Sequence, residues 1–463
     1  MPKKNKSIYF VSLGCPKNRV DSEVMLGVAK DSGYRIVDDP QGAETIVVNT
    51  CGFIGEAKKE SLDTILELAE LKTVGACKRL VVAGCLSQRY SSDLARDMPE
   101  VDHFLGTSDM LKLGDVLKDD GAERMLVGNP ADWVIRATDP RLLTNSRISA
   151  YVKIAEGCNR TCAFCTIPEF RGKQRSRPID DVVRECEQLI AQGVVELNLI
   201  SQDTISYGRD LKSKQDERLS ELVQRVADLP GARWVRLFYL YPETIDEALI
   251  DLLANHPRVL PYVDMPLQHA ADAMLKRMRR GHGIGRQRRV VERLRTSVPK
   301  LTFRTAFIVG HPGETDQEFE ELLDFVKWAE FEHVGVFRYS DEESAKSFDL
   351  GEKVPKAVAA ARYRKLMTTQ RSIAKKKNRA LIGETVEVLV EGTSDEHEWV
   401  MKGRHQGQAP EIDGSIYLSG AEVKAGQIRK ATVTQASDYD LVGEAHDLVS
   451  AARKKRVGLR VVA

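Results

Sequence analysis

The stretch EGCNRTCAFCTIPEFRG, residues 156–172, contains three cysteines in the spacing C-x-x-x-C-x-x-C. Cys158, Cys162 and Cys165 can supply three thiolates to a cubane iron–sulfur cluster, which leaves one of its irons open to an exchangeable ligand. A zinc site is the alternative, but zinc usually takes a fourth His or Cys close by. Because this loop contains no such residue, the spacing predicts an iron–sulfur cluster on these three cysteines.

The loop follows the strand-like segment AYVKIA, residues 150–155, and five more such segments alternate with helical patterns up to residue 380. They are VELNLI (195–200), WVRLFYL (234–240), YVDMPL (262–267), FRTAFIVG (303–310) and VGVFRYS (334–340). Strands that alternate with helices predict a parallel sheet, and six of them fit an incomplete β/α barrel. Such barrels place their chemistry at the C-terminal ends of the strands, and Cys158 follows one of these ends.

Three apolar segments nearer the N-terminus each run directly into a cysteine: IYFVSLGC into Cys15, TIVVNTC into Cys51 and LVVAGC into Cys85. Helical patterns at 17–33 and 55–71 separate them, which predicts a second parallel α/β sheet. Ligands of open parallel sheets gather at the carboxyl ends of the strands. We therefore interpret the three cysteines as a second cluster site, with buried structural cysteines as the alternative. Cys77 and Cys186 lie in helical contexts and are interpreted as incidental thiols.

The chain after residue 381 loses its helical periodicity. Short alternating segments at 385–390, 398–403, 415–419 and 427–435 are separated by turn residues, which predicts a small antiparallel β-barrel of the oligonucleotide-binding kind. Residues 132–146 have the character of a linker. The expected fold class is therefore α/β with three domains, at 5–131, 144–380 and 381–449.

Charge is unevenly distributed although the net charge is only +1. Residues 356–380 contain nine Lys or Arg and no acid, whereas residues 381–449 contain thirteen acids and five bases. Opposite charge blocks indicate more than one partner surface, with solvated helix faces as the alternative. Because phosphate contacts need Lys and Arg, the acidic terminal domain suits a basic protein better than a nucleic acid.

Eight cysteines that gather near motifs rather than in a disulfide framework are typical of a reducing compartment. No apolar run approaches the roughly 20 residues that span a bilayer. The basic N-terminus lacks the apolar stretch of a signal peptide. A cytoplasmic location is expected.

Eight motifs together resemble the radical S-adenosylmethionine methylthiotransferases, over nearly the whole chain. They are SLGCPKNRVDSE (12–23), VVNTCGFI (47–54), VAGCLSQRY (82–90), the loop at 156–172, ISQDT (200–204), MPLQHA (265–270), IVGHPGET (308–315) and FRYSDEE (337–343). The resemblance implies an N-terminal methylthiotransferase domain, a radical domain and a TRAM β-barrel.

The same resemblance implies two 4Fe-4S clusters and S-adenosylmethionine as cofactors. Cys158, Cys162 and Cys165 would hold the radical cluster, where cleavage of S-adenosylmethionine yields a 5′-deoxyadenosyl radical. Cys15, Cys51 and Cys85 would hold an auxiliary cluster that delivers the sulfur.

Six further residues are expected to bind S-adenosylmethionine. Gln202, Asp203 and Gln268 are polar groups at the catalytic rim of the barrel. By resemblance, Ile308 and Gly310 lie along the adenosine. Arg304 could neutralise a carboxylate, and a buried structural ion pair is its alternative.

The family has two branches, which modify adenosine in tRNA or an aspartate β-carbon of ribosomal protein S12. Gln268-His269-Ala270, the acidic run Asp341 to Glu343 and the acidic terminal barrel favour the second branch. The family's Glu-Gly-Thr is Glu342-Glu343-Ser344 here, which is a departure from the pattern.

The expected partners are ribosomal protein S12, an electron donor such as flavodoxin or ferredoxin, and ribosomal RNA through the basic segments. Two alternatives remain open: a tRNA methylthiotransferase, and a non-enzymatic cluster-bearing protein that binds RNA or ribosomes or senses redox state.

Overall fold

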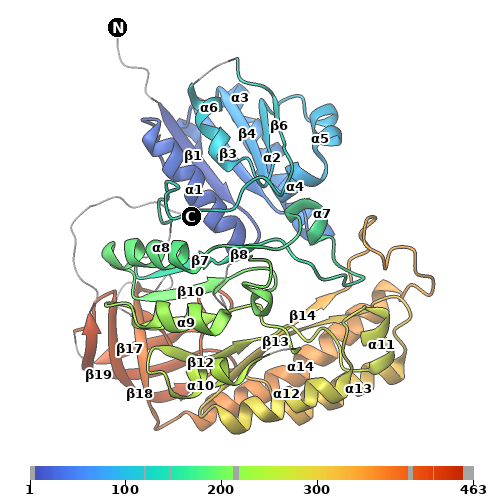
Figure 1. Ribbon diagram of the computed structural model, residues 1–463, viewed down its shortest axis with the longest axis vertical. Helices are drawn as coiled ribbons and strands as arrows, with labels where there is room; N and C mark the ends of the chain where they lie inside the picture. Colours follow the sequence, from blue (N-terminus) through green and yellow to red (C-terminus); the bar gives the residue numbers. More distant parts are fainter. Residues whose placement is uncertain are drawn as a thin grey trace.

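The computed structural model describes residues 6–118, 121–144, 147–211, 218–243, 245–394, 400–420 and 422–451. Three sheets follow one another along the chain, and Figure 1 shows the N-terminal sheet above the central sheet, with the C-terminal barrel beside the latter. The three-part α/β architecture predicted from the sequence is therefore confirmed.

The N-terminal sheet has six parallel strands in the order β2-β1-β3-β4-β5-β6. They are β1 (Ser7–Ser12), β2 (Arg35–Ile36), β3 (Thr45–Thr50), β4 (Arg79–Gly84), β5 (His103–Leu105) and β6 (Met125–Leu126). Its helices are α1 (Pro16–Asp31), α2 (Gly55–Ala69), α3 (Leu71–Val74), α4 (Cys85–Arg89), α5 (Ser91–Asp97) and α6 (Leu113–Lys118). The three strands expected from the sequence are β1, β3 and β4. Because β2, β5 and β6 have only two or three residues each, no periodicity could reveal them.

The central sheet has six parallel strands in the order β14-β13-β12-β11-β10-β7 and is not closed, as expected for a partial barrel. The strands are β7 (Ser149–Lys153), β10 (Glu196–Ile200), β11 (Trp234–Leu237), β12 (Val259–Asp264), β13 (Thr302–Val309) and β14 (His333–Arg338). The surrounding helices are α8 (Ile179–Ala191), α9 (Leu219–Ala227), α10 (Glu247–Asn255), α11 (Asp272–Arg277), α12 (Ile284–Ser297) and α13 (Asp316–Ala329). Most strand residues are buried, since helices and neighbouring domains cover both faces.

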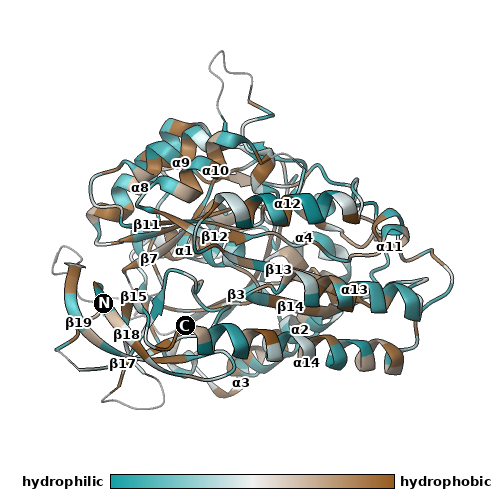
Figure 2. Ribbon diagram, turned by 90° about the horizontal axis from the view of Figure 1, so that it is seen from below, coloured by the Kyte–Doolittle hydropathy of each residue, from teal (hydrophilic) through white to brown (hydrophobic). Residues whose placement is uncertain are grey.

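A short hairpin-like pair, β8 (Ala155–Glu156) and β9 (Arg175–Ser176), closes the base of the cysteine loop, and α7 (Ile167–Arg171) lies within that loop. The long helix α14 (Lys356–Ala380) packs against β14 and leads to the last domain. Figure 2 shows both hydrophilic and hydrophobic bands on α14, as expected for a helix with one face on the protein. No helix among the described residues is long and apolar enough to cross a membrane.

The C-terminal domain is a closed barrel of β15 (Thr385–Thr393), β16 (Met401–His405), β17 (Ile416–Gly420), β18 (Gln427–Ala436) and β19 (Leu441–Ala451). The barrel was predicted, but not its last strand, β19. The expectation of a purely antiparallel barrel is wrong for one pair, because β17 and β19 run parallel. Barrel closure requires this pairing, and only the three-dimensional order of strands decides it.

The predicted linker has no helix or strand in its described part, residues 132–144, but it is not loose. Arg141 forms ion pairs with Glu23 of α1 and Glu185 of α8, and all three side chains are buried. Glu196 of β10 binds Arg404 of the C-terminal barrel and Arg236 of β11. Buried charge pairs therefore join the central domain to both of its neighbours.

Candidate active site: two cysteine triples at one interface

Cys15, Cys51 and Cys85 lie at the carboxyl ends of three neighbouring strands. β1 pairs with β3 and β3 pairs with β4, all in parallel, so the three ends share one edge of the sheet. The loops approach closely: a Cβ at Gly14 would lie 2.8 Å from the Cβ of Cys51, and one at Gly52 would lie 2.8 Å from the backbone of Cys85. Gly14 also has a φ of +93°, a left-handed conformation that favours glycine. Small residues thus allow the three cysteines to gather.

Cys158, Cys162 and Cys165 occupy a tight loop of the central domain. The amide of Cys165 donates to the carbonyl of Cys162 at 3.2 Å, and the amide of Cys158 donates to the carbonyl of Gly172 at 3.1 Å. The amide of Arg160 donates to the Sγ of Cys158 at 3.3 Å. These bonds hold the loop closed around its three cysteines.

Phe164 shields this loop, as its place between two cysteines suggests. Its ring and the side chain of Ile308 both pack against a small apolar cluster of Ala271, Met274 and Met278. The amide of Ala163, the residue before Phe164, donates a hydrogen bond to the carbonyl of Met278. The predicted adenosine residue Ile308 therefore lies beside the cysteine loop.

Burial raises the pKa of four of these thiols: to about 11 for Cys51 and Cys158, and to about 12 for Cys85 and Cys165. In the metal-free protein these thiols are protonated at neutral pH, so iron must displace protons to bind. Among the described residues, no three His, Cys, Asp or Glu side chains surround a single metal ion. The three thiolate ligands of a cubane cluster bind separate irons, so they need not surround one metal ion.

Gln202 and Asp203 follow β10 and carry buried oxygens without a partner. Arg160 binds the Oδ2 of Asp203 at 2.6 Å, whereas the Oδ1 of Asp203 and the Oε1 of Gln202 accept no hydrogen bond from the described chain. Buried polar atoms of this kind usually have partners, and a polar ligand would supply them.

A polar cavity of about 380 Å³ adjoins this loop. Its lining residues are Asn159, Arg160, Gln174, Asp203, Ser206, Arg209 and Asp210. Both polar atoms of the Gln174 amide are buried and unsatisfied, like Oδ1 of Asp203. The donors and acceptors present fit the amino acid portion of a cofactor such as S-adenosylmethionine.

Gln268 has a φ of +72°, which is strained for a residue with a side chain. Its backbone bridges to β13, donating to Ala306 and accepting from Ile308, while its half-buried side chain makes no hydrogen bond to the described chain. The structure thus places Gln268 beside Ile308, with its amide available.

Gly310 also has a positive φ, +79°, and the residues packed around it leave no room for a side chain. A Cβ there would lie 2.5 Å from the Cβ of Ala359 in α14, and its amide donates to Glu314. Glycine is required here by the helix that packs behind the strand.

Arg304 lies apart from Ile308 and Gly310. It is the third residue of β13, so about 13 Å of extended strand separates it from Ile308. Its guanidinium binds Asp264 at 2.8 Å and lies 3.5 Å from Asp413 of the C-terminal barrel. The structural ion pair that was the alternative for Arg304 is present, and the pKa of Arg304 is raised although burial alone would lower it, because Asp264 and its neighbours favour the charged form.

Lys17 and Arg171 were not singled out from the sequence, although both lie in the quoted motifs. Lys17 is buried, its Nζ lies 3.0 Å above the ring of Tyr239, and burial lowers its pKa to about 8. Tyr239 follows β11, so the residue two positions after Cys15 reaches the carboxyl side of the central sheet. The two sets of strand ends therefore face one interface.

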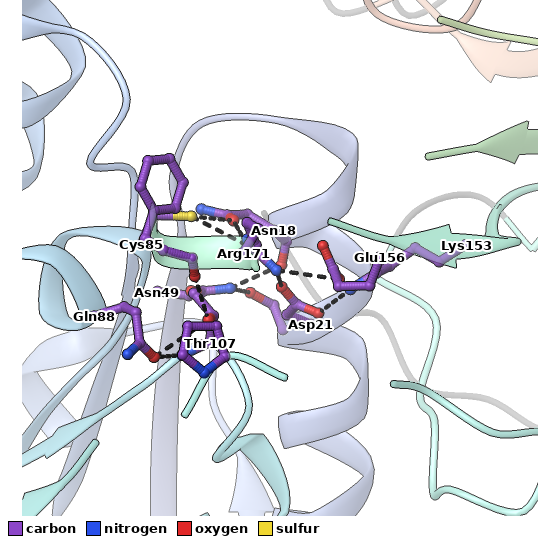
Figure 3. Close-up of polar contacts among 12 residues, drawn as sticks. Asn18, Asp21, Asn49, Cys85, Gln88, Thr107, Lys153, Glu156 and Arg171 are labelled. Carbon is purple, nitrogen blue, oxygen red and sulfur yellow. Dashed lines mark hydrogen bonds and ion pairs between the residues drawn. The ribbon is translucent and has the colours of Figure 1, made fainter. Parts of the chain in front are cut away.

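Arg171 joins the two cysteine sites directly (Figure 3). It ends α7, six residues after Cys165, and its Nη2 donates to the Sγ of Cys85 at 3.2 Å and to Asn18. Its Nη1 binds Asp21 at 2.7 Å. Only the docking of the two domains creates these contacts, so no sequence signal pointed to them.

Two residues that suggested the S12 branch, His269 and Glu342, form buried ion pairs within the protein. His269 is buried and pairs with Glu314. Glu342 is buried and binds Arg89 and Lys58 of the N-terminal domain. Since Arg89 also donates to the carbonyl of Gly52, Glu342 braces the loops that carry Cys51 and Cys85.

Three family models match the chain in the same order as its domains. The model described as Uncharacterized protein family UPF0004 matches residues 7–106, that of the Radical SAM superfamily matches 152–326, and that of the TRAM domain matches 382–445.

The chain is also similar to curated proteins over its whole length. A protein of Sorangium cellulosum named ribosomal protein uS12 methylthiotransferase RimO is 67% identical, over 99% of this chain and 98% of that protein. The protein of the same name from Myxococcus xanthus is 49% identical, over 94% and 91%.

A solved structure shares the fold. It is the radical S-adenosylmethionine methyltransferase TsrM from Kitasatospora setae with cobalamin and a 4Fe-4S cluster bound, with a TM-score of 0.52 and 16% identity over 72% of this chain and 75% of that one. Identity over the full length of the curated relatives is decisive, and the chain belongs to the RimO family of radical S-adenosylmethionine methylthiotransferases.

Proposed function

We propose that this enzyme adds a methylthio group to the β-carbon of an aspartate in ribosomal protein S12, with sulfur delivered from a second 4Fe-4S cluster. The observation that carries the proposal is a contact across the domain interface: Nη2 of Arg171, which belongs to the loop of Cys158, Cys162 and Cys165, lies 3.2 Å from the Sγ of Cys85. The names of the full-length relatives support the substrate.

The chain's own residues have separate roles in this proposal. Cys158, Cys162 and Cys165 hold the radical cluster, and Cys15, Cys51 and Cys85 hold the auxiliary cluster. When bound, these groups and S-adenosylmethionine supply a hydrogen-abstracting radical, the sulfur and the methyl group.

The side chains around the clusters bind and orient S-adenosylmethionine. Gln202, Asp203 and Gln268 present the polar atoms that the described chain leaves unsatisfied or unengaged. Ile308 packs against the same apolar cluster as Phe164 of the cysteine loop, and this cluster helps to keep water from the loop. Gly310 keeps the turn after β13 close to α14. Arg304, which forms an ion pair with Asp264, stays the predicted cation that neutralises a carboxylate of the cofactor or of the target aspartate.

The acidic terminal barrel supports a basic protein as substrate, although some of its carboxylates form ion pairs within the molecule. Asp413 is buried against Arg304, and Glu391 pairs with Arg404. Glu384, Glu444 and Asp447 remain exposed. These surface carboxylates can attract the Lys and Arg of a ribosomal protein.

Other parts of the functional assignment belong to the same proposal. We assign the domains to 5–131, 144–380 and 381–449, and expect a flavodoxin or ferredoxin as electron donor. Exposed arginines of α12, such as Arg286 and Arg289, support contact with ribosomal RNA. Cysteine ligands that must stay reduced support a cytoplasmic location.

The substrate is tested with purified enzyme whose clusters have been reconstituted, together with S-adenosylmethionine, dithionite and a peptide that carries the aspartate loop of S12. We expect the peptide to gain the mass of a methylthio group less one hydrogen. An unchanged peptide, with modified tRNA in a parallel reaction, would establish the tRNA branch instead.

Whether the protein is an enzyme is tested by measuring the amount of 5′-deoxyadenosine formed in the same reaction. A non-enzymatic cluster protein would release none. Iron and sulfide counts on the wild type and on each triple-cysteine variant determine whether there are two clusters.

A further inference from the structure

We infer that Arg171 is a positioning residue that couples the two cluster sites: it belongs to the loop of one cluster and hydrogen-bonds a cysteine ligand of the other. The inference rests on the proposed function, since it takes Cys85 as an auxiliary-cluster ligand. Arg171 binds the Cys85 thiolate, fixes the radical loop against the N-terminal domain and raises the reduction potential of the auxiliary cluster.

The guanidinium is oriented by contacts on both of its terminal nitrogens. Nη2 donates to the Sγ of Cys85 at 3.2 Å and to Oδ1 of Asn18 at 2.5 Å, and Nη1 binds Asp21 at 2.7 Å and Glu156 at 3.4 Å. Arg171 is 3% exposed, so these contacts are shielded from water. The planar fork of arginine suits several acceptors at fixed positions, which a lysine could not match.

The surrounding charges balance without the thiolate. Asp21 and Glu156 provide two buried carboxylates, and Arg171 and Lys153 provide two cations that contact both of them. Deprotonation of Cys85 by iron therefore adds a negative charge beside a guanidinium that is already in place.

The network extends from the auxiliary site to the cofactor-binding residues. The Nε2 of Gln202 donates to Oε1 of Glu156, whose other oxygen contacts Arg171. A continuous chain of contacts thus runs from Cys85 through Arg171 and Glu156 to Gln202, and Figure 3 shows its part from Cys85 to Glu156. A movement of the radical loop would displace the donor on Cys85.

The expected electronic effect follows from the charge of the reduced cluster. Reduction adds an electron, and a hydrogen-bonding cation on a ligand sulfur stabilises the more negative state. Replacing Arg171 by Gln should therefore shift the auxiliary-cluster potential to more negative values. A residue that served only as structural support would leave that potential unchanged in the molecules that retain the cluster.

The test uses the full chain with Cys158, Cys162 and Cys165 replaced by Ala, so that only the auxiliary cluster remains. Its midpoint potential is measured by a redox titration followed by electron paramagnetic resonance, with and without Arg171→Gln. We expect a negative shift with Arg171→Gln and a smaller one with Arg171→Lys, which keeps the charge but loses the fork. An unchanged potential in both variants would overturn the inference.

The matched control is Arg141→Gln. Arg141 is similarly buried and also links α1 to the central domain through Glu23 and Glu185, but none of its hydrogen bonds or ion pairs reaches a cysteine. It should lower stability without shifting the potential. An equal shift in Arg141→Gln would show that loosening the interface is the cause and would also overturn the inference.

Loss of Arg171 leaves two buried carboxylates with only Lys153 and could prevent folding. The double variant Asp21→Asn with Arg171→Gln removes one charge of each sign and keeps the test available. Iron content separates the two hypotheses: if the radical-site variant binds no iron, the proposed auxiliary cluster is wrong. If it binds a cluster whose potential is unaffected by Arg171→Gln, only the proposed coupling through Arg171 is wrong.

Discussion

The two proposed cluster sites each have three cysteines and, within the described residues, one guanidinium that donates to a cysteine, but they are built differently. Arg171 donates to Cys85 across a domain interface and is neutralised by Asp21 and Glu156. Arg280 donates to Cys162 at 3.2 Å from within the same domain, and it stacks on Tyr241. No carboxylate of the described chain pairs with Arg280. In the proposed assignment the radical site thus takes its arginine from its own domain, whereas the auxiliary site takes its arginine from the neighbouring domain.

The strongest test of this comparison removes one triple at a time. With Cys158, Cys162 and Cys165 replaced by Ala, 5′-deoxyadenosine should fall to background, because no cluster remains to reduce S-adenosylmethionine. With Cys15, Cys51 and Cys85 replaced by Ala, its formation should persist while the methylthiolated peptide disappears. Chromatography of both products checks this, and continued cleavage in the first variant would contradict the assignment of the two sites.

The interface with the C-terminal barrel provides a reference without cysteines. Glu196→Gln should destabilise the protein by about 3–5 kcal/mol, because Arg236 and Arg404 would lose a buried partner. Iron content should stay at the wild-type level, since neither triple lies at this interface. Urea denaturation and iron counting measure both, with the exposed Glu187→Gln as the matched control.

The contribution of Glu196 to the stability of this interface should depend on pH. Burial would raise the pKa of the Glu196 carboxyl, but Arg404 and Arg236 lower it to about 2. A carboxyl with a lowered pKa in the folded protein stabilises it above the unfolded value and loses this contribution as the pH falls toward the folded value. The difference in stability between wild type and Glu196→Gln should therefore shrink between about pH 4.5 and pH 2. A constant difference would contradict an ionised Glu196.

A smaller loss of stability is expected at Glu342 of the central domain, which supports the loops that carry Cys51 and Cys85. Glu342→Gln should cost about 3 kcal/mol, because Arg89 and Lys58 would lose a buried carboxylate. Iron at the auxiliary site should decrease, while the radical cluster is retained. The exposed neighbour Glu343 gives the control Glu343→Gln, which should leave both quantities unchanged.

The smallest loss of stability is expected for Arg280, the arginine of the radical site. Arg280→Gln should cost about 2 kcal/mol, less than Arg171→Gln, because it leaves no buried carboxylate unpaired. The radical-cluster potential should become more negative for the same reason as at Cys85. Equal losses of stability in the two variants, measured by urea denaturation, would contradict the difference described between the sites.

Much of the fold was predictable from periodicity, and the misses have physical reasons. Strands β1, β3 and β4 have six residues each with an apolar centre, whereas β2, β5 and β6 are too short to show a pattern. The parallel pairing of β17 with β19 is decided by barrel closure. Arg304 forms an ion pair with Asp264 of the neighbouring strand, a partner that only strand order could reveal, and its expected role at the cofactor stays a prediction.

The sequence by itself determined the three-domain order and the cysteine loop at 158–165, since closely spaced ligands belong to one short segment of chain. It also placed Cys15, Cys51 and Cys85 at strand ends, because each follows an apolar run. Only the tertiary structure decided that Arg171 would reach Cys85, 86 residues away. That contact depends on the order of strands in one domain and on buried charge pairs with another, and both are non-local interactions that no sequence window contains.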